Sequence, residues 1–221
     1  MFNGFTDATT DFLWQIRFNN EREWFLAHKQ DYMTAVWKPF RALAGEVYDA
    51  YMKNNPREEL NLHVSRIYRD ARRLHGMGPY KDHLWFSLRP ECDYWAEKPA
   101  LWFEINPEGY CYGMGVYAPK PAMMARCRRE MDEAPREMTE LAEKFAAQKR
   151  FINAGEEYAR KKGDALPPLD AWYNRKTVDL VCRRRVDKGF RSPGLVKNVT
   201  DGFKFLTPYY DYFSRMAAMA D

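Results

Sequence analysis

Residues 101–118 read LWFEINPEGYCYGMGVYA and predict a β-hairpin. In the first half, Leu101, Phe103 and Ile105 alternate with more polar residues, which is the period of a strand with one buried face. The tetrapeptide at residues 106–109, Asn-Pro-Glu-Gly, then suits a type I turn. Asn is favoured at the first position of that turn, Pro at the second and Gly at the fourth. The chain therefore contains an antiparallel strand pair near its middle.

The N-terminal part of the chain predicts two helices. The first begins at Thr6 or Asp7, and Asn20 followed by Glu23 predicts a capping box at the start of the second. The second helix places apolar residues at helical spacing. Pro39 predicts a kink or a break in it, because proline cannot donate the backbone hydrogen bond of a helix interior.

Further strands and helices surround the hairpin. Additional strands are expected at residues 63–70, 83–89 and 177–183. Helices are expected on the C-terminal side at residues 121–133, 135–149 and 194–219. Pro208 is the candidate point of interruption in the last helix. This order favours an α+β fold: a single domain over residues 1–221, with a central, mainly antiparallel sheet and helices from both termini packed on it.

The composition bounds the class of protein. Of the 221 residues, 46% are hydrophobic and 30% are charged, as in an ordinary globular chain with a packed core. The four cysteines lie far apart in sequence, which predicts reduced thiols in or near the core rather than a disulfide framework or a zinc site. No basic leader and no long apolar window is present, so we expect no membrane partner and a cytoplasmic location.

The excess positive charge is concentrated in one segment. The formal net charge of the chain is +4, and Val64–Arg89, with six basic and two acidic side chains, carries the same +4 by itself. An arginine is unfavourable to bury without a partner, so each guanidinium in this segment must reach solvent, a carboxylate or an anionic ligand. The segment is therefore the first place to look for a site.

Three short segments carry a family resemblance. They read NNEREWF at residues 19–25, SRIYRDAR at residues 65–72 and PYK at residues 79–81. Their order and spacing resemble the DUF2461 family of uncharacterised proteins, and the hairpin and the helix with Arg128 fit the later half of that family. The resemblance covers nearly the whole chain and implies a shared site without naming its chemistry. The loop at residues 73–78, RLHGMG, departs from the family pattern of an aromatic residue, Ser and lysines.

Side chains within these segments form the candidate site. Guanidinium groups bind carboxylate or phosphate through paired hydrogen bonds, a lysine adds a point charge, and tyrosines add hydroxyl donors. Asp70 is the candidate catalytic residue, since it can orient a guanidinium or act as a general base, and Glu104 could join it as an acid/base partner. The candidate ligand-binding residues, for an anionic small molecule, are Arg66, Tyr68, Arg69, Arg72, Tyr80 and Lys81.

A structural interpretation of the same charges stays open. The basic side chains could form an ion-pair network with Glu21, Glu23 and Glu104, and the protein would then be a scaffold without a ligand. The two interpretations differ in what the arginines contact. A network requires internal carboxylates around each guanidinium, whereas a ligand site requires a cavity beside unpaired ones.

Nucleic-acid binding is the other open alternative. Trp85 and Trp102 share the polar positions of their strands, and such aromatic side chains can stack unpaired bases. The basic run Arg183–Arg185 would add contacts to phosphates. A nucleic-acid binder should show one long positive stripe and strong salt dependence, whereas a small-molecule protein should show a concave pocket.

Metal binding is not favoured by the histidine pattern. His63, His75 and His83 are near one another in sequence, and with Asp70 or Asp82 they could ligate a metal or shuttle protons. Their spacing matches no metal motif, so no metal site is predicted. The sequence names neither a cofactor nor an oligomeric state.

Overall fold

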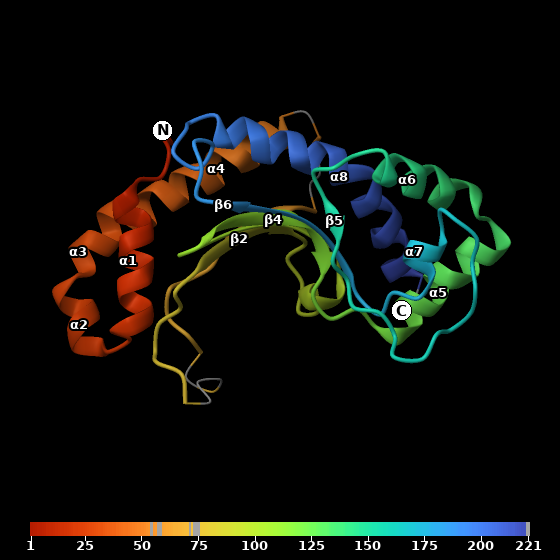
Figure 1. Cartoon of the computed structure of the whole chain (residues 1–221), viewed down its shortest axis with the longest axis horizontal. Coiled ribbons are helices and arrows are strands. Elements are labelled where there is room, and N and C mark those ends of the chain that lie inside the picture. Colours follow the sequence, from red (N-terminus) through yellow and green to blue (C-terminus); the bar gives the residue numbers. More distant parts are fainter. Residues whose placement is uncertain (54, 57–58, 71, 73–75, 220–221) are drawn as a thin grey trace. The chain divides into compact units, whose positions relative to one another are not determined.

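The computed structural model describes the chain except for residues 54, 57–58, 71, 73–75 and 220–221 (Figure 1). The N-terminal helices are α1 (Asp7–Phe18), α2 (Arg22–Ala27), α3 (Lys29–Asp31), the π-helical segment η1 (Tyr32–Trp37) and α4 (Lys38–Met52). The central elements are β1 (Asn61–Val64), β2 (Leu84–Arg89), the 3-10 helix η3 (Trp95–Glu97), β3 (Ala100–Asn106) and β4 (Gly109–Val116). The C-terminal elements are α5 (Pro121–Glu133), α6 (Arg136–Ala146), β5 (Ile152–Asn153), α7 (Asp170–Tyr173), β6 (Val178–Arg185) and α8 (Leu195–Ala218).

The strands form a six-stranded sheet in the order β1-β2-β3-β4-β6-β5. At its far edge β5 runs antiparallel to β6, with Ile152 opposite Val181 and Asn153 opposite Leu180. These elements confirm the predicted α+β class, with an antiparallel sheet and helices from both termini packed on it.

By its internal contacts the chain forms two compact units. The first unit comprises Met1–Leu88, Trp102–Tyr112 and Arg183–Gly202. The second unit comprises Arg89–Leu101, Gly113–Cys182 and Phe203–Asp221. Strands β3, β4 and β6 contribute residues to both units. That residues 1–221 make up a single domain stays a prediction.

The predicted hairpin is confirmed in β3 and β4. The Asn106 side-chain oxygen accepts hydrogen bonds from the backbone N–H groups of Glu108 and Gly109, both at 3.0 Å, and so closes the turn. Gly109 is required by close packing, because a Cβ atom there would lie 2.1 Å from the backbone carbonyl oxygen of Arg184 on β6. Asn and Gly at these two positions therefore have separate structural reasons.

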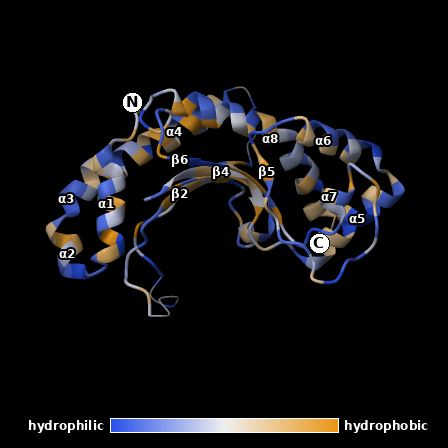
Figure 2. Ribbon diagram, in the orientation of Figure 1, coloured by the Kyte–Doolittle hydropathy of each residue, from blue (hydrophilic) through white to orange (hydrophobic). Residues whose placement is uncertain are grey.

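The core of the first unit lies between α4 and the sheet. The Phe86 ring lies 5.8 Å from Phe40 of α4 and 5.2 Å from Phe103 of β3, and all three are buried. Figure 2 shows hydrophobic and hydrophilic residues around α4, as expected of a helix with one face buried. On the opposite side of the strands, at the polar positions noted in the sequence, Trp85 and Trp102 are half-buried. We call that side of β2, β3 and their neighbours the polar face.

Aromatic side chains from α6, α7 and α8 build the core of the second unit. Tyr209 packs 6.1 Å from Trp172 and 5.7 Å from Phe145, and its hydroxyl donates to the Leu141 carbonyl oxygen at 2.9 Å. The predicted interruption at Pro208 is wrong, since α8 continues through it. Packing of the neighbouring Tyr209 in the core outweighs the loss of one backbone hydrogen bond.

Pro39 affects the helix in a different way than predicted. The helical path continues from η1 into α4, and Pro39 lies in the first turn of α4, where proline is tolerated. Proline cannot donate to the carbonyl four residues earlier, that of Ala35. The Thr9 hydroxyl of α1 donates to this oxygen at 2.7 Å instead. The irregularity is thus π-helical, and the buried Thr9 side chain of α1 supplies a donor to this carbonyl.

Two other N-terminal predictions need correction. Asn20 does not cap α2, which begins at Arg22 with Glu21 as its N-cap residue. The Asn20 side chain hydrogen-bonds to the backbone of Tyr80 instead. The strand expected at residues 63–70 is shorter, because β1 ends at Val64 and the pairing resumes only at Tyr68.

All four cysteines are free thiols, as predicted. Cys127 and Cys182 are buried and Cys111 is half-buried, but Cys92 is exposed, so for that residue the predicted place in or near the core is wrong. Burial raises the pKa of Cys127 to about 12. Within the described residues, none of the helices combines the length and apolarity that crossing a bilayer requires.

Candidate functional site

The residues singled out by sequence meet on a short antiparallel ribbon, formed by residues 65–70 and 79–81. Tyr68 is bridged to Tyr80, the Arg69 N–H donates to the Pro79 carbonyl oxygen at 2.8 Å, and the Lys81 N–H donates to that of Ile67 at 2.7 Å. We call this the Tyr68–Tyr80 ribbon. It brings together two of the three segments that carry the family resemblance.

Asn20 joins the third segment to this ribbon. Its side chain donates to the Tyr80 carbonyl oxygen and accepts from the Tyr80 N–H, each at 2.9 Å. The amide group therefore pairs with Tyr80 as a neighbouring strand would. Gly78 makes this approach feasible, because a Cβ atom there would lie 2.3 Å from the Asn20 side-chain oxygen. This contact explains why Asn20 is unavailable as a helix cap.

The two tyrosines of the ribbon have different environments. Tyr80 is 3% exposed and stacks on Phe25 at 4.2 Å, whereas Tyr68 is 52% exposed and touches Phe25 edge-on at 5.8 Å. Burial raises the pKa of Tyr80. Tyr80 is therefore a packing residue, and Tyr68 is the one that reaches solvent.

Most of the charged candidates on the ribbon are engaged in local structure. Arg69 donates its Nε–H to the Tyr80 carbonyl oxygen at 2.9 Å. Arg72 donates from Nε and Nη2 to the Asp70 carboxylate, at 3.1 and 2.8 Å, on the exposed surface. Asp70 also accepts the Arg72 backbone N–H at 3.0 Å. The carboxylate thus organises the turn that follows the ribbon.

Lys81 lies beside the polar face, close to other positively charged side chains. Its ammonium lies 5.9 Å from the centre of the Trp85 ring, a cation–π contact. Burial lowers the pKa of Lys81, and the positive charges of Arg69 and Arg66 lower it further. The nearby Glu104 carboxyl acts in the opposite direction and raises the pKa of Lys81. Lys81 and the two arginines are therefore neighbours, as the sequence analysis predicted.

A charge network next to Lys81 holds His83 in place. Arg17 of α1 donates to Asp82 at 2.6 Å and grips Glu108 with both terminal nitrogens, at 2.5 and 3.1 Å. Asp82 bonds His83 Nδ1 at 3.0 Å. Burial raises the pKa of Asp82, but the bonds from His83 and Arg17 outweigh it, so the pKa lies below its ordinary value. Asp82 is thus a carboxylate, and His83 Nδ1 carries the proton.

Glu104 lies on the polar face beside this network. Burial raises the pKa of its carboxyl above the ordinary value, which nearby His83 partly offsets. A hydrogen bond with the Asn106 side chain also favours the charged form. The acid next to Glu104 is Asp82 rather than Asp70, which was the acid/base partner proposed from sequence.

An open hollow adjoins Glu104 in the first unit, with a volume of about 630 Å³. Its walls come from β3, the hairpin turn, β4 and the end of β6. The side chains that line it include Trp102, Glu104, Cys111, Arg183 and Arg185. Both arginines are exposed, and the described part of the chain gives neither of them an ion pair. From sequence alone, a solvated face is the usual explanation of such a basic run, and a contact surface for acidic partners or nucleic acid is the alternative.

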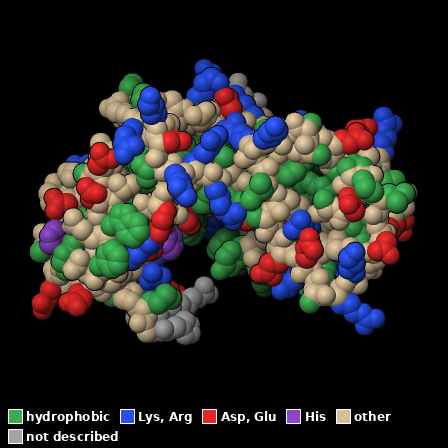
Figure 3. All heavy atoms as spheres, in the orientation of Figure 1, with side chains coloured by type: hydrophobic (Ala, Val, Ile, Leu, Met, Phe, Trp, Pro, Cys, Tyr) green, Lys and Arg blue, Asp and Glu red, His purple; other side chains and the backbone are tan. Residues whose placement is uncertain are grey.

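Acidic and basic side chains alternate over the surface. On the face drawn in Figure 3, Lys and Arg side chains stand among Asp and Glu side chains. Glu104 itself lies next to Lys81 and in the hollow with Arg183, so an acid stands between the two basic groups.

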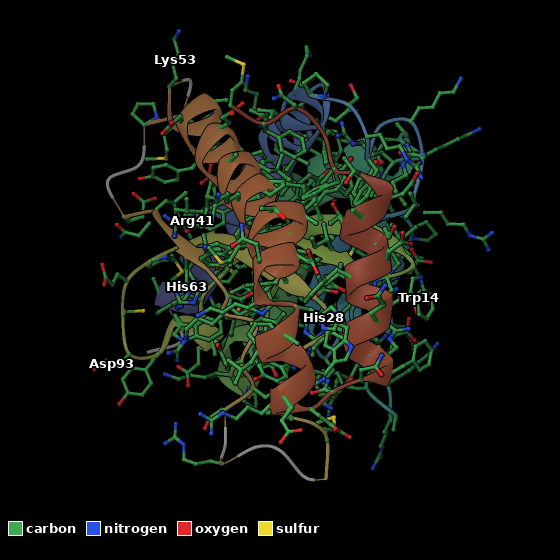
Figure 4. All side chains as sticks on the ribbon, turned by 90° about the vertical axis from the view of Figure 1, so that its left-hand side faces the viewer. Trp14, His28, Arg41, Lys53, His63 and Asp93 are labelled. Atoms are coloured by element: carbon green, nitrogen blue, oxygen red, sulfur yellow. The ribbon has the colours of Figure 1, made fainter. Side chains whose placement is uncertain are left out.

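The histidines have structural neighbours. His28 stacks on Trp24 at 4.2 Å and bonds its carbonyl oxygen through Nδ1 at 2.8 Å, on the helical layer seen in Figure 4. His63 packs 5.3 Å from Trp85, and His75 lies outside the described residues. Among the residues that are described, no group of three His, Cys, Asp or Glu side chains is arranged to hold a metal ion.

The family model described as "Conserved hypothetical protein (DUF2461)" matches residues 8–212. The chain belongs to the DUF2461 family. This confirms the resemblance drawn from the three segments. None of the curated proteins matches the chain. For this DUF2461 member, the ribbon contacts of Asn20 and Tyr80 give two of the family segments a structural reason.

Sequence reasoning missed the network around His83. Arg17 and Glu108 lie 91 positions apart, so nothing local connects them. The available signal was the adjacent pair Asp82-His83 at the start of a strand whose alternate residues are apolar. Glu104, at a polar position of its own strand, was considered only as a partner for other residues.

Proposed function

We propose that the polar face of the first unit binds a small anionic molecule and exchanges a proton with it. Arg183 and Arg185 bind the anionic group through their guanidinium donors. Glu104 and His83 are the proton-transfer groups, and Asp82 orients His83. The protein is then a small-molecule enzyme or binding protein, which is the class that the sequence favoured.

The observation that carries this proposal is the pairing of Glu104 with unpartnered arginines in one hollow. Arg183 and Arg185 receive no carboxylate from the described residues, although Glu104 and Glu108 line the same hollow. Glu108 is gripped by Arg17, so its charge is already used. Two adjacent, unneutralised guanidinium groups on one strand face favour an anion between them.

The acid/base part of the proposal is supported by two environments. The raised pKa of Glu104 brings its carboxyl closer to neutral pH, where a group can both give and take a proton. The Asp82 carboxylate fixes the His83 ring through Nδ1 and leaves Nε2 as the atom that exchanges a proton. His83 is close enough to Glu104 to lower the pKa of its carboxyl, in opposition to the effect of burial.

The cluster of Lys81, Arg66 and Arg69 contributes at longer range. Its positive charges are close enough together to lower the pKa of Lys81. Such a cluster raises the local concentration of anions and speeds their encounter with the site. We therefore keep Arg66 and Lys81 as attracting residues, with Tyr68 at the exposed edge of the ribbon, rather than as direct ligands in the hollow.

Nucleic-acid binding is the weaker alternative. A strand of phosphates needs a continuous track of positive charge. Here Glu104 lies between Lys81 and the arginines of β6, and Asp82 and Glu108 add further negative charge nearby. A small molecule with a single anionic group avoids those acids.

The test is a binding measurement on the full chain with defined anions. Sulfate, succinate and glycerol phosphate are added, and the melting temperature is followed, since a ligand that binds only the native state raises it. We expect a rise for at least one anion, and its loss in the double variant Arg183→Ala/Arg185→Ala. The control is Lys38→Ala/Lys53→Ala, which removes the same charge from the exposed surface of α4, where Figure 4 shows Lys53.

A second arm tests Glu104 with sulfate, whose charge is constant between about pH 5 and pH 8. Protonated Glu104 repels an anion less, so affinity should fall as the pH rises through the Glu104 pKa. Glu104→Gln should remove that fall. If no anion raises the melting temperature, or if the arginine variant keeps the full rise, the proposed function is wrong.

A further inference from the structure

We infer that the anionic molecule is a nucleoside phosphate, with its base against Trp102 and its phosphate on Arg183 and Arg185. This inference rests on the proposed function and adds the chemical class of the ligand. It depends on what the remaining walls of the hollow offer, in particular one aromatic side chain and one hydrogen-bonding group on β3.

Trp102 is the aromatic wall of the hollow, and its ring is available. On the neighbouring strand the Trp85 ring is already occupied, by His63 at 5.3 Å and by Lys81 at 5.9 Å. Trp102 is half-buried and lines the hollow. Among the described residues, no aromatic ring or cationic group packs against its ring. An indole exposed in a concave site is a platform for a flat heterocycle.

The strand order sets the distance between this platform and the arginines. β4 lies between β3 and β6, so the strands that carry Trp102 and Arg183 are two strand spacings, or about 10 Å, apart. Gly109 of β4 packs on Arg184 and Gly113 packs on Leu180, so the arginines lie toward the hairpin turn and a ligand that reaches them from Trp102 crosses β4 obliquely. Between them β4 contributes Gly109 and Cys111, which are small. A ligand that lies across β4 therefore needs a ring at one end, a phosphate at the other and a polar spacer between them. A nucleoside phosphate has this order of groups.

Glu104 meets the edge of the base in this arrangement. It follows Trp102 on the same face of β3, two residues along, and lines the hollow. The Asn106 side chain hydrogen-bonds to it, while the Asn106 oxygen holds the turn, so the carboxyl has a fixed direction. A carboxyl group can accept from, or when protonated donate to, the polar edge of a nucleobase.

The size and the charge of the site favour a mononucleotide over a polymer. A volume of about 630 Å³ is that of a pocket for one small molecule. Within the described part of the chain, the unpaired guanidinium groups of the hollow are those of Arg183 and Arg185, which lie at one end of it, on β6. The opposite end carries an acid, Glu104, which would repel a second phosphate.

Calorimetric titration of the full chain tests the inference with AMP, GMP, CMP and UMP against ribose 5-phosphate and sulfate. At least one nucleotide should bind roughly tenfold or more tightly than ribose 5-phosphate, because stacking on an aromatic side chain contributes on that scale. Trp102→Leu should reduce nucleotide affinity to that of ribose 5-phosphate and leave the sugar phosphate unchanged. Trp102→Phe should retain part of the preference, and Trp85→Leu, the matched control, should retain all of it.

The outcomes separate this inference from the function on which it rests. If ribose 5-phosphate binds as tightly as every nucleotide, or if Trp102→Leu leaves the preference intact, the nucleotide assignment is wrong and the anion site stands. If neither sulfate, sugar phosphate nor nucleotide binds, both are wrong. Circular dichroism on each variant verifies that the native fold is retained before its affinity is compared.

Discussion

The arginines of the Tyr68–Tyr80 ribbon and those of the hollow are chemically the same but have different partners. On the ribbon, Arg69 donates to a backbone carbonyl and Arg72 to the Asp70 carboxylate. In the hollow, Arg183 and Arg185 have no ion pair within the described chain. Arg66 of the ribbon, however, is exposed and has no ion pair with the described residues either. Local charge density, which first drew attention to the ribbon, therefore does not by itself tell which guanidinium groups are satisfied.

The two regions also differ in the reason for their glycines. At the ribbon, Gly78 lets a side chain, that of Asn20, approach the backbone. At the hollow, Gly109 lets β4 approach β6, because a Cβ atom at this position would collide with the Arg184 carbonyl oxygen. A side chain can move aside, whereas a strand backbone cannot, so substitutions at the two glycines should differ in their effect.

The largest effect is expected at the hollow. Gly109→Ala places a methyl group 2.1 Å from a backbone oxygen, so the β4–β6 pairing must shift, and we expect a loss of about 3 kcal/mol in the free energy of unfolding. Urea denaturation measures it. The control is Gly45→Ala in α4, where nothing lies within 4 Å of the added Cβ and a small gain is expected. Equal changes in the free energy of unfolding for Gly109→Ala and Gly45→Ala would contradict the close packing inferred at Gly109.

The next effect is expected at the ribbon. Gly78→Ala should displace the Asn20 side chain and break its two bonds to Tyr80, with a loss of about 2 kcal/mol. Asn20→Ala breaks the same bonds without the clash. The double variant should therefore be close to Asn20→Ala in stability, since alanine at position 20 leaves room for the methyl group. Fully additive losses would show that Gly78 acts through something other than Asn20.

Arginine substitutions test the comparison directly. Arg17→Ala should lower the free energy of unfolding by about 1.5 kcal/mol, because it leaves half-buried Asp82 without its guanidinium partner. Arg183→Ala should change it by less than about 0.5 kcal/mol, as expected of an exposed, unpaired residue. Chemical denaturation of both variants decides the matter. A loss at Arg183 as large as that at Arg17 would mean that the hollow's arginines are structural.

The smallest effect is expected at Glu104 and depends on pH. Its pKa is raised in the folded protein, so the folded state binds the proton more tightly than the unfolded state does. Stability should therefore fall as the pH rises from the ordinary glutamate pKa to the raised one. Glu104→Gln should remove this fall and be more stable than the parent at neutral pH but not at acidic pH. Melting temperatures across that range provide the measurement, and a parallel pH dependence in both proteins would refute the assignment.

Residue patterns predicted the elements of the fold more reliably than their ends. Alternation of apolar residues in β2 and β3 and the Asn-Pro-Glu-Gly turn are local signals, and the structure confirms both. The predicted cap at Asn20 was wrong because a contact sixty residues away in sequence competes for the same amide. The predicted break at Pro208 was wrong because core packing is stronger than one lost hydrogen bond.

By itself, the sequence determined the α+β class, the hairpin and the family, because each depends on residue type and short-range order. Only the tertiary structure decided which charged groups are satisfied. Arg17 reaches Asp82 and Glu108 from a distant helix, while Arg183 and Arg185 form no ion pair with any residue that the structure describes. The physical reason is that the free energy of a charge depends on the few ångströms around it, and folding brings distant residues into that space.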